Sequence, residues 1–426
     1  MEHMSPDRQS ETFDIVIVGG SLAGLALARA LALSLDHQAR IALIERHPVA
    51  ATEADADPRA YALAAGSKRM LDALGVWAHL TPPAEPVRAI DITDSGLEHA
   101  VRPVLISYDS SIADDEPATW PATWPAMWIV EGAALRSALL GAVARTPGVS
   151  ALHRSEARSY AANSAGVTLV LADGARLHAR LLVAADGRHS PLRAAAGIKT
   201  VRWSHPQIGI VTIVSHERPH EGHAVQHFLP GGPFAILPLG GDRSCITWTE
   251  DKERGRAILQ LDDTAFLAQV QQRFGYKLGS LALAGPRASW PLEFLMARSL
   301  TAPRFALAGD AVRSVHPIAG QGLNLGLRDV AALTECIADA MRLGLDPGDG
   351  TALDRYERWR RFDSVASAAA FEALNALFSN DSTLLRAARD AGLGVVQRLP
   401  GLKRALVSEA AGQTGELPRL LKGEMA

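Results

Sequence analysis

A glycine-rich turn follows the first apolar run of the chain. Gly19 and Gly24 occupy the outer positions of a G-x-G-x-x-G pattern, and Ser21 stands at the middle position. After a strand, these positions permit a tight turn, close approach to a pyrophosphate, and close packing of the next helix on the strand. Leu22 and Ala23 complete the turn, and free N–H groups at the start of the helix can bind phosphate. The pattern alone is weak, because a strand–helix turn without a ligand has a similar sequence.

An acidic residue strengthens the prediction of a nucleotide site. Glu45 ends the next apolar run and is followed by Arg46. It comes about twenty residues after the turn, where an acid can bind ribose hydroxyls. The extra CH₂OH of Ser21 either bonds a phosphate oxygen or crowds it. Together these residues predict a dinucleotide site.

Four short apolar runs must position these residues. Each is rich in aliphatic side chains and ends at glycine or an acid; they are 13–20, 40–46, 181–187 and 305–311. Continuous apolar runs are typical of parallel strands that are buried on both faces. A helix over 22–35 would join the first two runs into a βαβ unit. In such sheets ligands lie at the carboxyl ends of the strands, where Gly19, Glu45, Asp186 and Asp310 are expected.

The segment 205–287 has short β-rich runs separated by Gly, Pro and Asp, which predict an antiparallel sheet. A long helix is expected over 322–341, followed by mostly helical sequence. The predicted fold is α/β with an α+β insert and a Rossmann-like nucleotide-binding domain. Its predicted parts are the nucleotide domain (12–80, 128–200 and 288–345), an inserted substrate-binding sheet domain (81–127 and 201–287), and a helical C-terminal region (346–426).

Bulk properties exclude several classes of protein. The chain has 426 residues and a net charge of −3, which gives no electrostatic footprint for nucleic acid. Its two cysteines, Cys245 and Cys336, are far apart, which argues against a disulfide framework or a zinc site. The N-terminus is polar, and the longest aliphatic stretch, 25–35, is too short to span a bilayer. We expect a cytoplasmic protein, with contact at the inner-membrane surface left open.

Three motifs together resemble the single-component (class A) flavin hydroxylases, whose fold is like that of p-hydroxybenzoate hydroxylase. They are the first turn with Glu45, the Asp186-Gly187 pair, and Gly309-Asp310 followed by a glycine-rich helix start. Within the last motif, HPIAGQGLNLGLRD (316–329) matches the signature of the ubiquinone-biosynthesis hydroxylases at every fixed position. Further similarities lie at 57–67, 232–239 and 416–423, so the resemblance covers nearly the whole chain. Ser21 is the main departure.

The resemblance implies FAD as cofactor. Glu45 would hold the adenosine ribose, the first turn the pyrophosphate, and Asp310 the ribityl hydroxyls. The loop from Pro317 would pass beside the flavin ring, where only bare backbone can lie so close. The residues expected to bind the cofactor are Gly19, Ser21, Leu22, Ala23, Gly24, Glu45, Arg46, Arg59, Asp186, Gly187, Gly309, Asp310, Pro317, Gly320, Gln321, Gly322, Leu323 and Asn324. Arg59 has an alternative interpretation as an exposed loop arginine, and Asn324 one as a brace of the loop and helix.

The resemblance also implies the chemistry. NAD(P)H would reduce the flavin, O₂ would give a C4a-hydroperoxide, and hydroxyl would pass to a polyprenylated phenol in ubiquinone biosynthesis. No second strand–glycine–helix fingerprint appears, so NAD(P)H would bind transiently, near Asp186-Gly187. We expect no catalytic side chain; His316 is a candidate to aid phenol ionisation, with loop bracing as the alternative. A hydroxylase of a soluble aromatic and a non-catalytic flavin-binding scaffold remain alternatives.

Three other features leave alternatives open. His216, His220, His223 and His227 have helical metal-site spacing, but Pro219 and Gly222 interrupt them, so we expect a solvated hairpin loop and no metal. The repeat at 117–128 is either a packed loop or an aromatic lip. The segment 393–412 is either a helix pair packed on protein or a membrane-surface helix. Contact with other ubiquinone-biosynthesis enzymes and a homodimer are further expectations that stay open.

Overall fold

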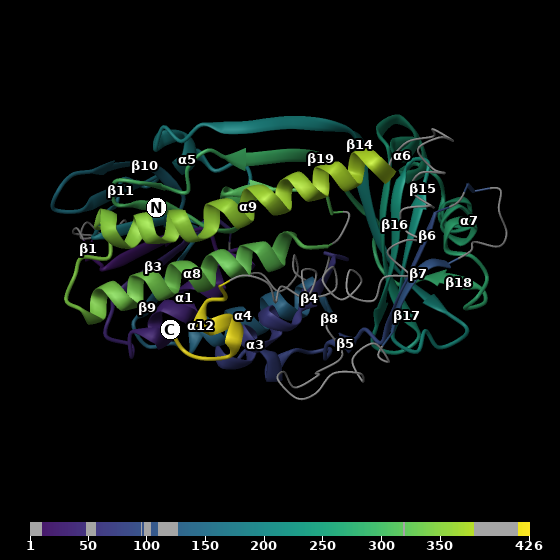
Figure 1. Ribbon diagram of the computed structural model, residues 1–426, viewed down its shortest axis with the longest axis horizontal. Coiled ribbons are helices and arrows are strands. Elements are labelled where there is room, and N and C mark those ends of the chain that lie inside the picture. The colour runs from purple at the N-terminus through teal and green to yellow at the C-terminus, as the bar shows by residue number, and fades with distance from the viewer. Residues whose placement is uncertain are drawn as a thin grey trace, which may run out of the picture.

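A computed structural model describes residues 11–47, 57–94, 96–97, 104–109, 127–317, 320–378 and 416–426 (Figure 1). The segment 393–412 lies outside the described residues. So does the repeat at 117–128, except for Met127 and Trp128. Across the described ranges, no helix combines the length and the apolar character needed to cross a bilayer.

The four apolar runs form neighbouring strands of one six-stranded sheet, as predicted. These strands are β2 (Ile15–Val18), β3 (Ile41–Glu45), β13 (Leu181–Ala184) and β21 (Phe305–Leu307). The order across the sheet is β20-β21-β13-β2-β3-β9, with β9 (Val149–His153) and β20 (Thr301–Ala302) at the edges. All pairs from β21 to β9 are parallel, so their carboxyl ends share one edge. The residues of β2, β13 and β21 are buried, and so are those of β3 up to Ile44, as expected for strands covered on both faces of a sheet.

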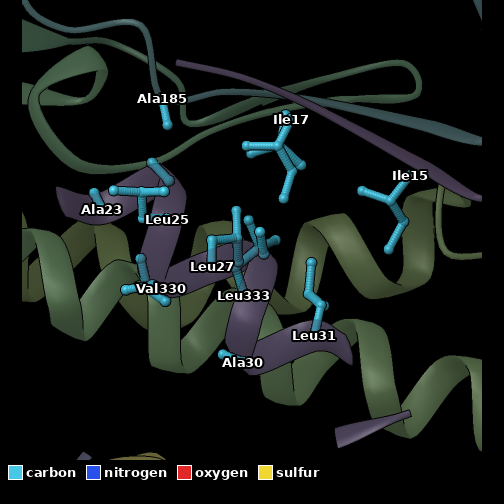
Figure 2. Packing of buried hydrophobic residues seen from close by; sticks show 14 of the residues in the cluster. Ile15, Ile17, Ala23, Leu25, Leu27, Ala30, Leu31, Ala185, Val330 and Leu333 are labelled. Carbon is cyan, nitrogen blue, oxygen red and sulfur yellow. The ribbon is translucent and has the colours of Figure 1, made fainter. Parts of the chain in front are cut away.

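Helix α1 (Leu22–Ser34) follows β2, and its first turn is capped by Ser21. It packs on α8 (Gly322–Arg342) and on α4 (Gly132–Ala144). Figure 2 shows Leu27 of α1 beside Leu333 of α8, near Ile17 of the sheet. Helix α1 is buried nearly all round because it lies between the sheet and two other helices. Helix α9 (Gly350–Phe378) packs on α8 and lies on the outside of the molecule (Figure 1).

The expected inserted sheet is present, but one of its pairs is parallel. Its order is β22-β19-β14-β17-β16-β15-β6-β7, with β18 paired to β14. Strands β15 and β6 run parallel, because β6 comes from a segment far earlier in the chain and joins the sheet by a crossover. The bounds are β6 (Ala89–Asp94), β7 (Val104–Asp109), β14 (Thr200–His216), β15 (His223–Leu229), β16 (Gly232–Leu239), β17 (Arg243–Asp251), β18 (Leu281–Leu283), β19 (Ala288–Ala297) and β22 (Arg313–Ser314).

Two small sheets were not expected from the sequence. One has the order β1-β12-β11-β10, and the other has the order β4-β8-β5. Their strands are β1 (Glu11–Thr12), β12 (Arg176–Ala179), β11 (Val167–Leu171), β10 (Ala157–Ala162), β4 (Ala60–Ala64), β8 (Met127–Glu131) and β5 (Glu85–Pro86). The remaining elements are α3 (Ala65–Ala73), η1 (Trp77–His79), α5 (Pro191–Ala195), α6 (Lys252–Leu259), α7 (Asp263–Phe274), η3 (Gly309–Ala311) and α12 (Arg419–Lys422).

Strand β14 links the two large sheet regions. Its first residues, Thr200–Ser204, pair with β19 alone, and from Gln207 onward it also pairs with β17. Figure 1 shows β14 and β19 reaching from the inserted sheet toward the nucleotide-sheet side of the molecule. Strands β6 and β7, from the 81–127 segment, extend the same inserted sheet. The residue bounds of the three predicted parts stay a prediction.

Candidate functional site

The turn after β2 is made by glycines that the surrounding backbone requires. Gly19 has a φ of 112°, and a Cβ placed on it would stand 2.3 Å from the Ala185 carbonyl oxygen. A Cβ on Gly24 would stand 1.8 Å from the Gly19 carbonyl oxygen. A Cβ on Gly20 would stand 2.5 Å from Glu45 Oε2, which is a side-chain atom that can move. Backbone packing alone therefore accounts for Gly19 and Gly24, which bring strand, turn and helix close together.

Ser21 is the N-cap of α1. Its Oγ accepts a hydrogen bond from Gly24 N at 3.4 Å and donates one to the Ala185 carbonyl oxygen at 3.2 Å. Serine is a favoured N-cap because its oxygen satisfies an N–H of the first helical turn. The hydroxyl thus fastens the start of α1 to the end of β13, and the side chain itself is exposed.

Glu45 lies at the carboxyl end of β3 and faces the turn. Its Oε2 accepts a hydrogen bond from Gly20 N at 2.7 Å, and its Oε1 accepts one from His47 N at 2.8 Å. Each carboxylate oxygen has a second lone pair, so the group can still accept bonds from a ligand. Its neighbour Arg46 is exposed, with a guanidinium nitrogen 3.8 Å from Glu156.

A cavity of about 490 Å³ opens at this edge of the sheet. Seven of the predicted residues line it, namely Gly19, Ser21, Glu45, Arg46, Arg59, Asp186 and Gly187. Sequence reasoning missed Arg136 of α4, which also lines the cavity and donates from Nη1 to the Gly20 carbonyl oxygen at 2.7 Å. The sequence feature that could have pointed to Arg136 is that it is the one charged residue in a mostly apolar helix directly after a strand. Arg136 and Arg59 place guanidinium groups on the cavity wall, beside the carboxylates of Glu45, Asp57, Glu156 and Asp186, and a guanidinium can bind phosphate.

Arg59 is fixed by Asp57 rather than free in a loop. Its Nε donates to Oδ1 and Oδ2 of Asp57 at 2.9 and 2.8 Å, and its guanidinium lies 5.8 Å from the Trp290 ring centre. The hydrogen bond to Asp57 raises the pKa of Arg59. Arg59 is exposed and lies outside helices and strands, yet it lines the cavity, so its role as a ligand contact stays a prediction.

Asp186 and Gly187 follow β13 on the same edge. Neither carboxylate oxygen of Asp186 has a hydrogen-bond partner among the described residues. Burial raises the pKa of Asp186, while the nearby Ser190 hydroxyl and Arg193 lower it. Gly187 has a φ of 86°, which favours glycine, and a Cβ there would meet nothing within 4 Å. The pair therefore presents an unsatisfied acid and an open backbone to the cavity.

The third motif packs directly on the first. A Cβ on Gly309 would stand 2.9 Å from the Ala23 Cβ, and one on Gly326 would stand 3.3 Å from the Gly309 Cα. The start of α8 is thereby held against the first turn. Asp310 is exposed to solvent, and it is not among the residues that line the cavity. Desolvation raises the pKa of Asp310, and the charges of Arg188 and Arg59 lower it.

The loop before α8 is exposed at its glycines and anchored by Asn324. Gly320 has a φ of 61°, and a Cβ on Gly322 would meet nothing within 4 Å. The Asn324 side chain accepts from Ala64 N at 3.0 Å and donates to the Ala62 carbonyl oxygen at 2.8 Å. The Asn324 side chain therefore braces the start of α8 against β4. Gln321 Oε1 accepts from Asn324, Leu323 packs partly on the core, and Pro317 is half-buried.

His316 precedes this loop and is fully buried, with 2% of its surface exposed. Neither ring nitrogen has a hydrogen-bond partner among the described residues. Burial lowers the pKa of His316 to about 3, with a further contribution from His205, whose ring centre lies 5.4 Å away. The imidazole is therefore neutral at physiological pH. The absence of hydrogen bonds within the described part of the chain weighs against a simple loop-bracing role.

The prediction of a solvated loop at the four-histidine stretch is wrong for three of its members. His216, His220 and His227 are buried, because they lie on or beside strands of the inserted sheet. His216 contacts Ser244 Oγ and the Arg218 carbonyl oxygen, and His220 contacts the Leu239 carbonyl oxygen. His227 pairs with Thr93. Among the described residues, no group of three or more potential ligands lies close enough to hold a metal ion.

Comparison with known proteins identifies the family. A family model described as an FAD binding domain matches residues 12–370. The chain belongs to this FAD-binding family. This FAD-dependent monooxygenase is 40% identical to a ubiquinone hydroxylase, UbiL, of Rhodospirillum rubrum, over 96% of this chain and 92% of that protein. It is 30% identical to the 3-demethoxyubiquinol 3-hydroxylase of Escherichia coli, over 94% of this chain and 98% of that protein.

Solved structures agree on the fold of the monooxygenase. A p-nitrophenol 4-monooxygenase of Pseudomonas putida superposes with a TM-score of 0.77 at 18% identity, over 96% of this chain and all of that one. FAD is the cofactor, and NAD(P)H and O₂ are the usual co-substrates of the class.

Proposed function

We propose that this monooxygenase hydroxylates the aromatic ring of a polyprenylated phenol in ubiquinone biosynthesis. The observation that carries the proposal is the 40% identity to a ubiquinone hydroxylase along almost the whole length of both chains. A second relative, at 30% identity, is named as a hydroxylase of a ubiquinol precursor.

The residues of the site fit FAD. Glu45 would accept bonds from the adenosine ribose, and the Gly19–Gly24 turn would meet the pyrophosphate, with Arg136 supplying charge. Asp310, beside the start of α8, would hold the ribityl hydroxyls. The flavin ring would lie along the Pro317–Gly322 loop, where Gly322 leaves space that no protein atom fills. The positive end of the α8 dipole would then stabilise negative charge on the ring.

Bound FAD supplies the redox and oxygen chemistry, and the protein supplies binding, orientation and exclusion of water. Asp310 and Glu45 orient the cofactor by hydrogen bonds to its sugar groups. Asp186-Gly187 would meet NAD(P)H as it binds and leaves. His316, neutral and without a partner among the described residues, is the candidate to accept a proton from the phenol.

We also propose roles for the predicted parts of the chain, a membrane contact and protein partners. The predicted sheet domain (81–127 and 201–287) would form the substrate-binding part, with β19 and β22 completing its sheet, and the other two predicted parts would hold FAD and support it. Because a polyprenyl chain is apolar, the substrate would reach the site from a lipid surface, so we propose peripheral contact with the inner membrane. Association with other enzymes of ubiquinone synthesis and as a homodimer is also proposed.

The test is a product assay with the full chain loaded with FAD. We expect a short-chain prenylphenol to stimulate NAD(P)H oxidation and to yield a hydroxylated product by mass spectrometry. Cells that lack the protein should accumulate one ubiquinone precursor. Stimulation by water-soluble phenols alone would favour the soluble-aromatic alternative, and FAD binding without O₂-dependent turnover on any phenol would favour the scaffold.

A further inference from the structure

Three titratable side chains from distant parts of the chain meet behind the flavin-side loop. They are His316 before α8, His205 of β14 and Glu372 of α9. The His316 and His205 ring centres lie 5.4 Å apart with the rings edge to face, and His205 Nε2 lies 3.4 Å from Glu372 Oε1. The side chain of His205 is 8% exposed and that of Glu372 is 18% exposed. None of these contacts follows from sequence proximity.

The backbone of β14 is built to aim His205 at this point. The ladder between β14 and β19 shifts register between Ser204 and Ile208, and Pro206, which has no N–H donor, lies inside the shift. Such irregularities re-aim a side chain and are common beside active sites. Here the shift places His205 between the loop residue His316 and the helix α9.

The polar atoms of the cluster lack ordinary partners. His205 Nε2, Glu372 Oε1 and both ring nitrogens of His316 are buried without a hydrogen bond in the part of the chain that the structure describes. Buried polar groups are almost always hydrogen-bonded, because desolvation without a bond costs about 1–3 kcal/mol per group. His316 has no such bond among the described residues, and His205 Nε2 and Glu372 Oε1 have only their mutual contact at 3.4 Å, so the cluster is costly as a purely structural feature. These groups are the right chemistry for moving a proton.

We propose that His316, His205 and Glu372 form a proton path from the flavin-side loop to the outer helix α9. The path rests on the proposed function in that a phenol is the proton source. His316 accepts the proton from the phenol hydroxyl as the O–H bond breaks and an N–H bond forms, leaving a phenolate. His316 releases a proton from its other nitrogen to His205, directly or through one water molecule, and His205 passes a proton to the Glu372 carboxylate. Glu372 returns it to solvent at α9, so atoms and charge balance, and a flip of each imidazole ring restores its starting tautomer.

The surrounding charges are consistent with this direction of transfer. His205 is the one titratable group whose charge affects His316 in the described part of the chain, and it lowers the pKa of His316. Glu372 from α9 lies 3.4 Å from His205 Nε2, so its carboxylate is placed to accept a proton from that nitrogen. Arg313 of β22 is bound to Asp329, and Glu293 of β19 lies opposite Ser204 across the ladder. A proton on His316 is disfavoured by burial, and the carboxylate acceptor lies at the outer end of the path. His205 and Glu372 act through His316 and are positioning residues.

The first experiment needs no turnover. The full chain loaded with FAD and carrying ¹³C-labelled histidine is titrated by NMR, with the His205 signal assigned from the His205→Gln variant. Because Glu372 Oε1 lies 3.4 Å from His205 Nε2, Glu372→Gln should displace the His205 ring signals from their wild-type positions. The surface variant Glu253→Gln serves as the matched control and should leave those signals unchanged. Unaltered His205 signals in Glu372→Gln would refute the contact that the path needs.

The second experiment follows the reaction itself. With a prenylphenol, His205→Gln and Glu372→Gln should lower kcat for hydroxylated product by about 10²-fold, with KM and anaerobic flavin reduction by NAD(P)H unchanged. Added imidazole should restore part of kcat, and Glu372→Asp should retain most of it. A kcat equal to wild type, or a loss that neither imidazole nor aspartate relieves, would overturn the path. If wild-type protein makes no product from any phenol, the proposed function fails, whereas the NMR titration still tests the path.

Discussion

A Cβ on Gly24 would stand 1.8 Å from the Gly19 carbonyl oxygen, so the first helical turn of α1 lies directly on the end of β2. Ser21, between the two, bonds Gly24 N and the Ala185 carbonyl oxygen. The serine that departs from the usual glycine pattern therefore caps the helix and ties it to β13. A serine N-cap can therefore occupy the middle position of the G-x-G-x-x-G pattern while the cavity beside it stays open.

Ser21→Gly should leave FAD bound. A serine N-cap replaced by glycine costs only a few tenths of a kcal/mol, which corresponds to less than about twofold in Kd if the whole effect falls on binding. Isothermal titration of the apoprotein with FAD measures it. Ser21→Ala, which loses the cap without gaining backbone freedom, is the comparison and should lower stability by about 1 kcal/mol. A wild type unable to bind FAD, with binding restored in Ser21→Gly, would contradict this account.

Gly322→Ala should weaken FAD binding without harming the fold. A methyl group there meets no atom of the described residues within 4 Å, and alanine is the better helix former, so the unfolding free energy should stay equal or rise by up to about 1 kcal/mol. The methyl would instead enter the space proposed for the flavin, and we expect at least about tenfold weaker FAD binding, or 1.4 kcal/mol. Gly350→Ala, equally open at the start of α9, is the matched control. Equal FAD affinity in both variants would move the flavin away from this loop.

Glu45→Gln should reduce FAD affinity while keeping the turn. The amide oxygen still accepts from Gly20 N, but the amide nitrogen cannot accept from His47 N, which is exposed to water, or from a ribose hydroxyl. We expect a loss of about tenfold in affinity, near 1.4 kcal/mol, measured by fluorescence as FAD is bound. Thermal unfolding of the apoprotein should change little, and a large fall there would mean that Glu45 serves the turn alone.

Asp329→Asn should unfold the protein more easily than any of these changes. Asp329 is fully buried and accepts from Arg313 at 2.8 Å and from Arg360 at 2.9 Å, so it joins β22, α8 and α9. Removing one partner of a buried ion pair costs about 3–5 kcal/mol, because the remaining charges stay buried. Urea denaturation should show this loss, while Asp354→Asn on the exposed face of α9 stays within about 0.5 kcal/mol of wild type.

His316 should make the fold sensitive to acid. Its pKa is about 3 in the native state against 6.5 when unfolded, so below pH 6.5 the unfolded chain takes up a proton that the native state refuses. Stability contributed by neutral His316 is complete above pH 6.5 and falls by up to about 1.4 kcal/mol per pH unit as the pH drops toward 3. Denaturation at pH 7 and at pH 5 should show a smaller decline in His316→Gln than in wild type. Equal declines would contradict the burial of this ring.

The nucleotide sheet was predictable because its strands are continuous apolar runs that end at Gly or acid. Burial on both faces leaves such a pattern in the residues themselves, and β2, β3, β13 and β21 lie where the runs lie. The small sheets were missed because strands such as β10 and β12 are half exposed and carry arginine and histidine, which gives no clear apolar alternation. The parallel β15–β6 pair depends on a distant crossover that local pattern cannot encode.

The site residues that belong to a motif could be predicted, because the motif requires a particular backbone geometry. The site residues that only tertiary packing brings together could not. Gly19, Glu45, Asp186 and Gly187 line one cavity because parallel strands bring their carboxyl ends together. Arg136 reaches the same cavity from a helix with no motif of its own. The burial of the histidines in the 216–227 stretch depends on strands that pair across the inserted sheet, so their spacing in sequence misled the prediction of a solvated loop.

The order in which the strands of the nucleotide sheet occur along the chain has a consequence during synthesis. Strand β13 pairs with β2 on one side, but its other partner, β21, begins only at residue 305. While residues 185–304 emerge from the ribosome, β13 is an unprotected edge made of Leu, Leu, Val and Ala, the kind of edge that pairs with other chains. The nascent protein is therefore most prone to aggregate late in translation, and chaperone demand should peak before the Gly309–Asp310 turn is made.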